Sequence, residues 1–415
     1  MQQEPRDITA LCLAYARAEP PEDVRTVMQL SVLDWAACGI AGRSDGTFAA
    51  WAAQFVGQGP ATRFDGHRGT PAETALVNGT LSHALDYDDT HFAHIGHPSV
   101  AVIPAALAAT EARGGSLAQM IEAALVGAEA SVAVGLWLGR AHYQVGYHQT
   151  ATAGAFGATV AAGRVWGLGD AAMRHALGLC STMASGLKSQ FGTMGKPLNA
   201  GLAARTGVEA AQWAQAGMTS ASDGLAAPLG FGDTHHGAGD TVDFEWRMGS
   251  VSHKFHACCH GLHATLEAVR DAPLRDATSV LVHTHPRWLT VCNQPAPDSG
   301  LGAKFSYTHV LAMAAHGIDT SDIAAFSDVC ATDPVLCQWR SRVRVVADDT
   351  LTEMQARVSV DGRVFEYDLD APLGFEARRD RVRQKARALM GARADDIAQA
   401  IENDDLERFT QLLVS

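Results

Sequence analysis

The sequence predicts a mainly α-helical protein with a large all-helical domain and a smaller α+β lid domain. Up to about residue 240, apolar and small residues recur at helical spacing and no segment has a strong strand pattern. Short β-branched runs with turn signals then appear before residue 380. The 415 residues also exceed the size at which one core keeps growing. We therefore expect domains at 1–245 and 246–380, with C-terminal helices at 381–415 closing on the helical domain.

The helical domain is expected to consist of closely packed, apolar helices. Residues 8–42 predict two helices that are separated at Pro20-Pro21, because proline interrupts the helical hydrogen bonds. Small residues on every side of a helix allow close packing, which is typical of the centre of a many-helix domain. Further helical segments are expected over residues 70–84, 100–112, 117–138, 152–166, 171–183 and 201–218.

The smaller domain carries the strand signals. Asp361-Gly362 lies between two β-branched runs and predicts a hairpin turn. A helical segment over 303–315 interrupts the strands, and the tail predicts amphipathic helices over 381–390 and 395–413. Strands are expected over residues 279–283, 342–347, 356–360 and 364–369.

Composition excludes several classes of partner. The formal charge of −13 argues against nucleic acid or an anionic membrane surface, because both require basic patches. The first residues lack the basic and apolar regions of a secretory signal, and no run of about 18 apolar residues is uninterrupted. The eight cysteines, including the adjacent pair Cys258-Cys259, follow neither a disulfide framework nor a zinc pattern. We expect a reduced, cytoplasmic protein.

Lysine is used sparingly in this chain. Only five of the 32 basic residues are lysine, and a lysine among arginines suggests a site that needs a compact, titratable ammonium group. Lys196 and Lys254 lie in Gly-rich and Cys-rich stretches, so we expect them to be functional. For Lys304 and Lys385 we expect ordinary surface positions.

The stretch from His83 to Ser99 concentrates titratable side chains between two apolar helices. Buried charges are costly when unpaired, so such a cluster at the edge of a core indicates a function. A zinc or iron site was considered, but Gly96 and Pro98 would break a helix that aligned its ligands, and no HExxH or CxxC motif accompanies them. We therefore expect no metal. The ligands considered were His91, His94 and His97, with Asp86, Asp88 and Asp89 nearby.

Three further stretches contain candidate site residues. His148 precedes an Ala/Gly-rich helix, where a lone histidine is more often structural. Lys196 follows a Gly-bearing loop just ahead of a helix N-terminus, which favours an anion. The third stretch runs from Lys254 to His263 and includes the cysteine pair. Lysines that hold carboxylates, with histidines and aspartates that move protons, suit proton abstraction next to a carboxylate.

Together these stretches resemble the MmgE/PrpD family, whose members include 2-methylcitrate dehydratase, cis-aconitate decarboxylase and iminodisuccinate epimerase. The likeness rests first on His83-Ala84-Leu85-Asp86-Tyr87-Asp88-Asp89-Thr90 with His97-Pro98-Ser99, and on Phe191-Gly192-Thr193-Met194-Gly195-Lys196-Pro197 with Ala200-Gly201. It is extended by Lys254 with Cys258-Cys259 and His263, by Ala303-Lys304-Phe305-Ser306, and by Pro372-Leu373-Gly374.

The resemblance implies an enzyme without metal or organic cofactor, a homodimer, and a site in the cleft between the domains. Its substrate would be a small di- or tricarboxylate, with Lys196 and Lys254 on substrate carboxylates and His148 or Asp86 as the base. Asp88 and Asp89 would brace their loop through backbone hydrogen bonds. The positions that match the family's site are Asp86, Thr90, His97, His148, Lys196 and Lys254, with His263, His309, Cys258 and Cys259 as further substrate contacts.

The exact reaction is left open by departures from the family pattern. Dehydration of a 2-methylcitrate-like substrate ranks first, as the commonest named activity in the family. Epimerisation ranks second, with His309 as a candidate second base where the family often has tyrosine. Decarboxylation ranks third, because Cys258-Cys259 falls where the decarboxylases have a histidine. A further departure is Asn199, which stands where the family commonly has a histidine after Lys-Pro-Leu. A homologue that binds a carboxylate without turnover is the remaining alternative.

Overall fold

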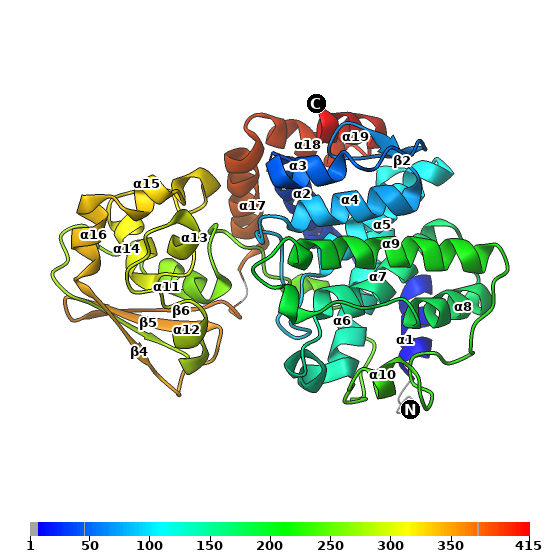
Figure 1. Cartoon of the computed structure of the whole chain (residues 1–415), viewed down its shortest axis with the longest axis horizontal. Helices are drawn as coiled ribbons and strands as arrows, with labels where there is room; N and C mark the ends of the chain where they lie inside the picture. The colour runs from blue at the N-terminus through cyan, green and yellow to red at the C-terminus, as the bar shows by residue number, and fades with distance from the viewer. Residues whose placement is uncertain (1–6, 45, 372) are drawn as a thin grey trace. The chain divides into compact units, whose positions relative to one another are not determined.

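The chain forms two compact units that are interleaved in sequence (Figure 1). The computed structural model describes residues 7–44, 46–371 and 373–415, so Pro372 of the last motif lies outside the described residues. The larger unit comprises Met1–His253 with Val382–Ser415, and the smaller unit comprises Lys254–Arg381. The chain therefore leaves the larger unit after His253 and returns to it at Val382.

The larger unit is built almost entirely from helices. The break at Pro20-Pro21 and the predicted helical segments are found, with bounds that differ by a few residues. Two short strands, β1 (Ala61–Thr62) and β2 (Arg68–Gly69), form an antiparallel pair where no strand was predicted. The helices up to His253 are α1 (Ile8–Arg17), α2 (Glu22–Gly42), α3 (Gly46–Ala52), α4 (Pro71–His83), α5 (Pro98–Arg113), α6 (Leu117–Gln144), α7 (Gln149–Val165), α8 (Asp170–Ser181), α9 (Gly195–Gln215) and α10 (Phe231–Thr234), with 3₁₀ turns η1 (Lys188–Gln190) and η2 (Met248–Ser250).

The C-terminal tail supplies three more helices, α17 (Phe375–Met390), α18 (Arg393–Glu402) and α19 (Leu406–Val414). The boundary between the units falls within α17, after Arg381. The single tail helix predicted over 395–413 is interrupted at Asn403–Asp405, where the Asp405 side chain accepts from the Arg408 backbone N–H and caps α19. A capping residue starts a new helix rather than continuing the previous one.

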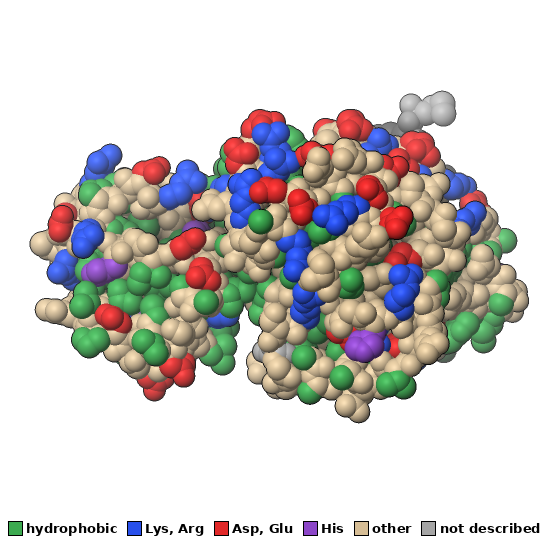
Figure 2. Space-filling view, turned by 90° about the horizontal axis from the view of Figure 1, so that it is seen from above, with side chains coloured by type: hydrophobic (Ala, Val, Ile, Leu, Met, Phe, Trp, Pro, Cys, Tyr) green, Lys and Arg blue, Asp and Glu red, His purple; other side chains and the backbone are tan. Residues whose placement is uncertain are grey.

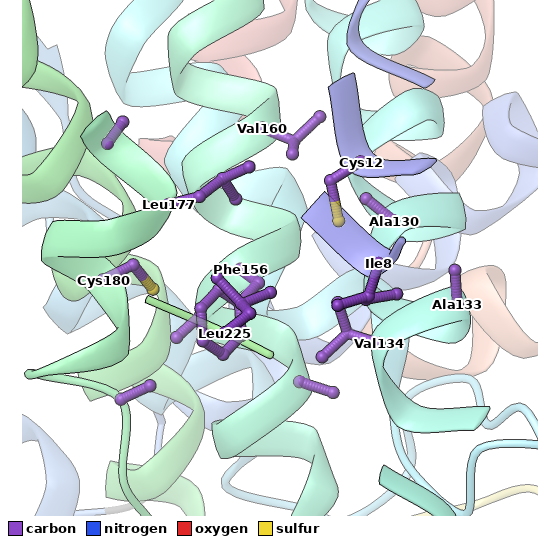
Figure 3. Packing of buried hydrophobic residues seen from close by; sticks show 14 of the residues in the cluster. Ile8, Cys12, Ala130, Ala133, Val134, Phe156, Val160, Leu177, Cys180 and Leu225 are labelled. Atoms are coloured by element: carbon purple, nitrogen blue, oxygen red, sulfur yellow. The ribbon is translucent and has the colours of Figure 1, made fainter. Parts of the chain in front are cut away.

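Small residues allow the central helices to pack closely, as predicted. α7 is buried along its length from Gln149 to Gly163. A Cβ on Gly127 of α6 would come within 2.6 Å of the Gly157 carbonyl oxygen, and one on Gly79 of α4 would meet the Cα of Gly201 at 2.9 Å. Figure 3 shows the core around Phe156 and Val160, packed against Ile8, Val134 and Leu177 from three other helices.

One of these core helices has the length and composition of a membrane span. α6 has a mean hydropathy of 1.6 over its most apolar window, but 89% of that window is buried inside the fold. Ser116 caps its N-terminus in a capping box with Gln119, which defines where the helix begins. The apolar side chains of α6 are therefore buried by protein contacts, as in a core helix.

The smaller unit is a mixed α+β structure with a four-stranded sheet in the order β4-β3-β5-β6. β3 pairs in parallel with β4 and antiparallel with β5, and Asp361-Gly362 forms the predicted β5–β6 hairpin. The strands are β3 (Val280–Thr284), β4 (Val343–Ala347), β5 (Gln355–Val360) and β6 (Arg363–Asp368). The helices are η3 (His260–Leu262), α11 (His263–Ala268), α12 (Pro286–Val291), α13 (Gly300–Ala303), α14 (Tyr307–Ala315), η4 (Ile323–Ala325), α15 (Asp328–Ala331) and α16 (Pro334–Arg340).

Charged side chains of both signs are interspersed on the face drawn in Figure 2. The excess of acidic residues is therefore not concentrated in one large patch on that face.

Candidate active site

The loop between α4 and α5 folds back on itself, so that the ends of the two helices meet. His83 is the last residue of α4, and His97 immediately precedes α5. Their rings contact edge to face, with centroids 4.6 Å apart. Asp86 makes the turn between them in the left-handed region, at a φ of 51°, which aspartate tolerates better than most residues. The loop thus places an exposed carboxylate beside two buried histidines.

Asp88 joins the two histidines. One carboxylate oxygen lies 2.8 Å from His83 Nδ1, and the other lies 2.9 Å from His97 Nδ1. Burial alone would raise the pKa of Asp88, but the charges and hydrogen bonds of the two rings outweigh it and hold that pKa well below its ordinary value. Because an ionised carboxylate only accepts, both rings carry a proton on Nδ1. Asp88 was expected to make backbone hydrogen bonds, and it instead orients two side chains.

Lys196 brings a positive charge to the same place from α9. Its ammonium nitrogen lies 2.6 Å from Asp86 Oδ1, which is also 3.5 Å from His97 Nε2. α4, α9 and α7 run side by side (Figure 1), so the first turn of α9 lies next to the end of α4. Asp86 keeps 46% of its side chain exposed, and Lys196 keeps 17%. The pair is therefore accessible to a ligand.

His148 completes the cluster from the start of α7. Its ring stacks at 6.0 Å from the His83 ring and meets Phe191 edge-on at 4.9 Å. Burial lowers the pKa of His148 well below its ordinary value, and the nearby His83 and Lys196 charges lower it further. His148 is therefore neutral at physiological pH. The structure brings together four predicted residues: Asp86, His97, His148 and Lys196.

Thr90 and Asp89 lie on the inner part of the same loop. Thr90 forms a two-residue antiparallel bridge with Ser252, through two backbone hydrogen bonds of 2.8 Å. Asp89 accepts from the Ser99 hydroxyl at 2.5 Å and from the Ser99 backbone N–H at 3.4 Å, so it braces the start of α5. Burial raises the pKa of Asp89 to about 7. Asp89 thus makes one of the backbone hydrogen bonds that were expected of it.

His91 and His94 point away from a shared site with His97. His91 Nε2 donates to the Arg247 carbonyl oxygen at 3.0 Å. The His94 ring is fully buried against Gly135, where a Cβ would come within 2.7 Å of the ring Nδ1, and burial lowers the His94 pKa well below its ordinary value. The three equally spaced histidines that suggested a metal site in the sequence, His91, His94 and His97, therefore do not form one shared site.

A different set of side chains could hold a cation. The ligand atoms of His83, Asp86, Asp88 and His97 lie within 4.8 Å of one another among the described residues. In the structure Asp88 is hydrogen-bonded to His83 and lies within ion-pair distance of His97, and Lys196 already neutralises Asp86. These pairings favour proton transfer and anion binding over cation binding, because a metal would have to displace both the ring protons and the ammonium group.

The remaining predicted residues belong to the smaller unit. Lys254 is buried at its first position, in a loop that also carries Cys258 and Cys259. Burial raises the pKa of the Cys258 thiol above its ordinary value. His263 Nε2 donates to the Cys258 carbonyl oxygen at 3.3 Å, and burial lowers the His263 pKa well below its ordinary value.

His309 has a structural partner within the smaller unit. It is fully buried in α14, and its Nδ1 accepts from two guanidinium nitrogens of Arg340, at 2.7 and 3.1 Å. Burial, together with the Arg340 charge, lowers the pKa of His309 to about 4. A histidine held this way is a poor proton acceptor.

Sequence reasoning missed three residues that the structure ties to the site. His83 and Asp88 lie in the first motif but were not predicted as site residues, and no sequence signal shows that their side chains pair. Asn199 was noted only as a departure, but its side-chain nitrogen lies 3.3 Å from His148 Nδ1. Spacing along the sequence could not show that α9 carries Asn199 to α7.

Comparisons with known proteins cover both units. A model of the MmgE/PrpD N-terminal domain matches residues 6–243, and a model of the MmgE/PrpD C-terminal domain matches residues 254–408. The cis-aconitate decarboxylase of Aspergillus terreus is 27% identical over 281 residues, or 59% of this chain and 56% of that protein. The aligned part thus spans a little over half the length of that relative.

Two further relatives carry related names. The cis-aconitate decarboxylase-like protein oryM of Aspergillus oryzae is 26% identical over 399 residues, which cover 83% of this chain and 81% of that protein. The cis-aconitate decarboxylase of Homo sapiens is 32% identical over 167 residues, or 39% of this chain and 34% of that protein.

Proposed function

Because the chain belongs to the MmgE/PrpD family, we propose that it is a lyase or isomerase that removes the α-proton of a small di- or tricarboxylate without a cofactor. The observation that carries the proposal is the chain of contacts from Lys196 through Asp86, His97 and Asp88 to His83, with neutral His148 beside it. An exposed lysine–carboxylate pair can exchange its carboxylate for that of a substrate, and proton donors and acceptors then lie next to the bound group.

In this proposal Lys196 binds a substrate carboxylate and thereby releases Asp86. The freed Asp86 and His148 are the two groups considered as the base, and His97 with Thr90 helps to hold substrate. Lys254 of the smaller unit supplies the second cation for a carboxylate, as the resemblance implies. Positive charge next to the carboxylate stabilises the enolate-like transition state that proton removal creates.

Dehydration of a 2-methylcitrate-like hydroxy acid remains the first candidate reaction. The base takes the α-proton, the C–O bond to the β-hydroxyl breaks, and the hydroxyl leaves as water with a proton from the acid. A carbon–carbon double bond forms between the two carbons, so atoms and electrons balance without an oxidant or reductant. The site contains two titratable groups in different environments, so that one can donate a proton and the other can accept one in these two transfers.

Decarboxylation is the second candidate, and the names of the relatives favour it. Against it stands the pair Cys258-Cys259, which falls where the resemblance places a histidine in the decarboxylases. A thiol carries no positive charge in either protonation state, so neither cysteine can serve as a cationic proton donor. Epimerisation ranks lower than the sequence suggested, because its candidate second base, His309, accepts hydrogen bonds from Arg340.

Incubation of the purified protein with candidate acids in heavy water distinguishes these reactions. The panel contains 2-methylcitrate, citrate, cis-aconitate and iminodisuccinate. Alkene formation supports the dehydratase, carbon dioxide release supports the decarboxylase, and deuterium at the α-carbon without net product supports the epimerase. His148→Ala is expected to abolish turnover, whereas Arg205→Ala, on the exposed side of α9, leaves it unchanged. Absence of exchange and product across the panel would overturn the proposal.

The assembly is proposed to be a homodimer, as the resemblance implies. Sedimentation velocity of the purified chain tests this, because a dimer and a monomer of 43.8 kDa chains sediment at clearly different rates. A single species of monomer mass at micromolar concentration would contradict it.

A further inference from the structure

We propose that Asn199 is a positioning residue that fixes His148 in the tautomer with its proton on Nε2, so that His148 donates to the substrate and Asp86 is the base. This inference rests on the proposed function and decides between its two candidate bases. It concerns a position at which the chain departs from the histidine that is common in the family.

The orientation of the Asn199 amide follows from its two neighbours. Asn199 is buried near the start of α9, and its Nδ2 lies 3.3 Å from the Leu187 carbonyl oxygen and 3.3 Å from His148 Nδ1. A carbonyl oxygen only accepts, so the NH₂ side of the amide must face Leu187. The same NH₂ group then directs its second hydrogen at His148 Nδ1, which accepts.

The ring of His148 is held in place independently of the amide. Its backbone N–H donates to the Gly186 carbonyl oxygen at 2.9 Å, where His148 precedes α7. Phe191 meets the ring edge-on, and the His83 ring stacks against its face. Burial holds the pKa of His148 well below its ordinary value, and the nearby positive groups lower it further, so the ring is uncharged at neutral pH. A neutral ring whose Nδ1 accepts carries its single proton on Nε2.

His83 and His97 have a different partner at Nδ1. Their Nδ1 atoms face the Asp88 carboxylate, so each of these rings carries a proton on Nδ1. Three neighbouring histidines are therefore divided by their partners, an amide donor for His148 and a carboxylate acceptor for the other two. With Nε2 already protonated, His148 can polarise a substrate oxygen or protonate a leaving hydroxyl, but it cannot take the α-proton at that atom. The α-proton then falls to Asp86, which is exposed at the site and released when substrate occupies Lys196.

The tautomer can be measured directly by ¹⁵N–¹H correlation of the full chain labelled with ring-¹⁵N histidine. The His148 signal is assigned by its loss in His148→Gln. We expect Nδ1 of His148 to be unprotonated and Nε2 to carry the proton, unchanged between pH 6 and 8. A proton on Nδ1, or on both nitrogens, at neutral pH would overturn the inference.

A variant provides the second test. Asn199→Asp replaces the amide donor with a carboxylate acceptor, so the His148 proton should move to Nδ1 and the ring should titrate at higher pH. We expect kcat to fall by at least about tenfold, with a smaller change in KM and a shifted pH profile. Leu202→Asp, on the same helix but exposed, adds the same charge and should change neither the tautomer nor the profile.

The outcomes separate this inference from the proposed function. An unchanged tautomer and pH profile in Asn199→Asp would overturn the positioning role while turnover stands. If no acid in the panel is turned over, the wild-type spectrum still decides the tautomer. If Asn199→Asp does not fold, the wild-type measurement decides alone.

Discussion

Two lysines contact consecutive residues of the loop after α4, and each forms an ion pair with an aspartate. The two ion pairs differ mainly in how much of their side chains is exposed. Lys196 lies 2.6 Å from Asp86, with 17% and 46% of the two side chains exposed. Lys385 lies 2.5 Å from Asp34, with 1% of each exposed. Lys385 also donates to the Tyr87 carbonyl oxygen and lies 4.0 Å from the centre of the Tyr87 ring. The difference teaches that a lysine–aspartate pair can serve either ligand binding or structure. Only the more exposed pair can exchange one of its partners for a ligand.

Removal of the buried lysine should have the largest effect on stability. Lys385→Met leaves Asp34 buried without its cation, which should cost about 3–5 kcal/mol of unfolding free energy. Urea denaturation measures this, and the double variant Lys385→Met/Asp34→Leu should recover most of the loss. Arg383→Met, which removes an exposed pair from the same helix, should cost at most about 1 kcal/mol. Equal losses for Lys385→Met and Arg383→Met would mean that the buried pair is not special.

Removal of the exposed lysine should affect turnover rather than stability. Lys196→Ala deprives a substrate carboxylate of its cation, and we expect at least about a hundredfold loss of kcat/KM, equivalent to about 2.7 kcal/mol. The free energy of unfolding should change by less than about 1 kcal/mol. Product assays and urea denaturation of the same preparation measure both. Full activity in Lys196→Ala, with Arg205→Ala as the control, would contradict the assignment of the open pair to binding.

The pH dependence of stability should report Asp89, on the buried side of the loop. Burial, together with the nearby Asp34 charge, raises the pKa of Asp89 to about 7. The folded state therefore holds a proton that the unfolded chain releases near pH 4, so this contribution to stability is present below pH 4 and is lost as pH rises to 7. The slope is at most about 1.4 kcal/mol per pH unit.

Asp89→Asn isolates this contribution, because Glu129 titrates in the same range and His91 titrates with the opposite sign. The stability of the wild type minus that of the variant should decrease between pH 4 and 7. Denaturation midpoints at intervals of half a pH unit provide the curve. Parallel curves for the two proteins would show that Asp89 does not titrate in this range.

The smallest expected effect concerns the backbone of the exposed side. Asp86 adopts a φ of 51°, which asparagine tolerates but alanine does not. Asp86→Asn should leave stability nearly unchanged, whereas Asp86→Ala should cost about 1–2 kcal/mol, and both should lose activity with the carboxylate. Equal stability of the two variants would argue that the turn relaxes.

Local sequence patterns were enough to predict most long helices and the β5–β6 hairpin, whereas the four residues that meet at the site were predicted together only through the family resemblance. The tail helix shows where local patterns fail. Lys385 was expected at the surface, and this was wrong: α17 is rich in arginine, so its pattern indicates a solvated helix, and only three of its residues are buried. Its partner Tyr87 is 298 positions away, and no pattern within one helix reveals such a contact.

The hydrogen-bond partners within the site could not be predicted from the sequence either. The sequence placed Asp88 and His83 in a conspicuous stretch, but the choice between a backbone brace and a side-chain bridge depends on how the loop returns to α4. The contact of Asn199 with His148 depends on the packing of α9 against α7, which small residues permit but do not specify. Residue types thus predicted the chemistry, and only packing determined which atoms meet.

Because the chain returns to the larger unit only at Val382, the contacts of its last helices can form only late in biosynthesis. Tyr87 leaves the ribosome 298 residues before Lys385, which corresponds to roughly 15–60 s at usual elongation rates of about 5–20 residues per second. Throughout that interval Lys385 cannot contact Asp34 or Tyr87. The inner side of the loop after α4 is therefore completed only when the last helices have been made.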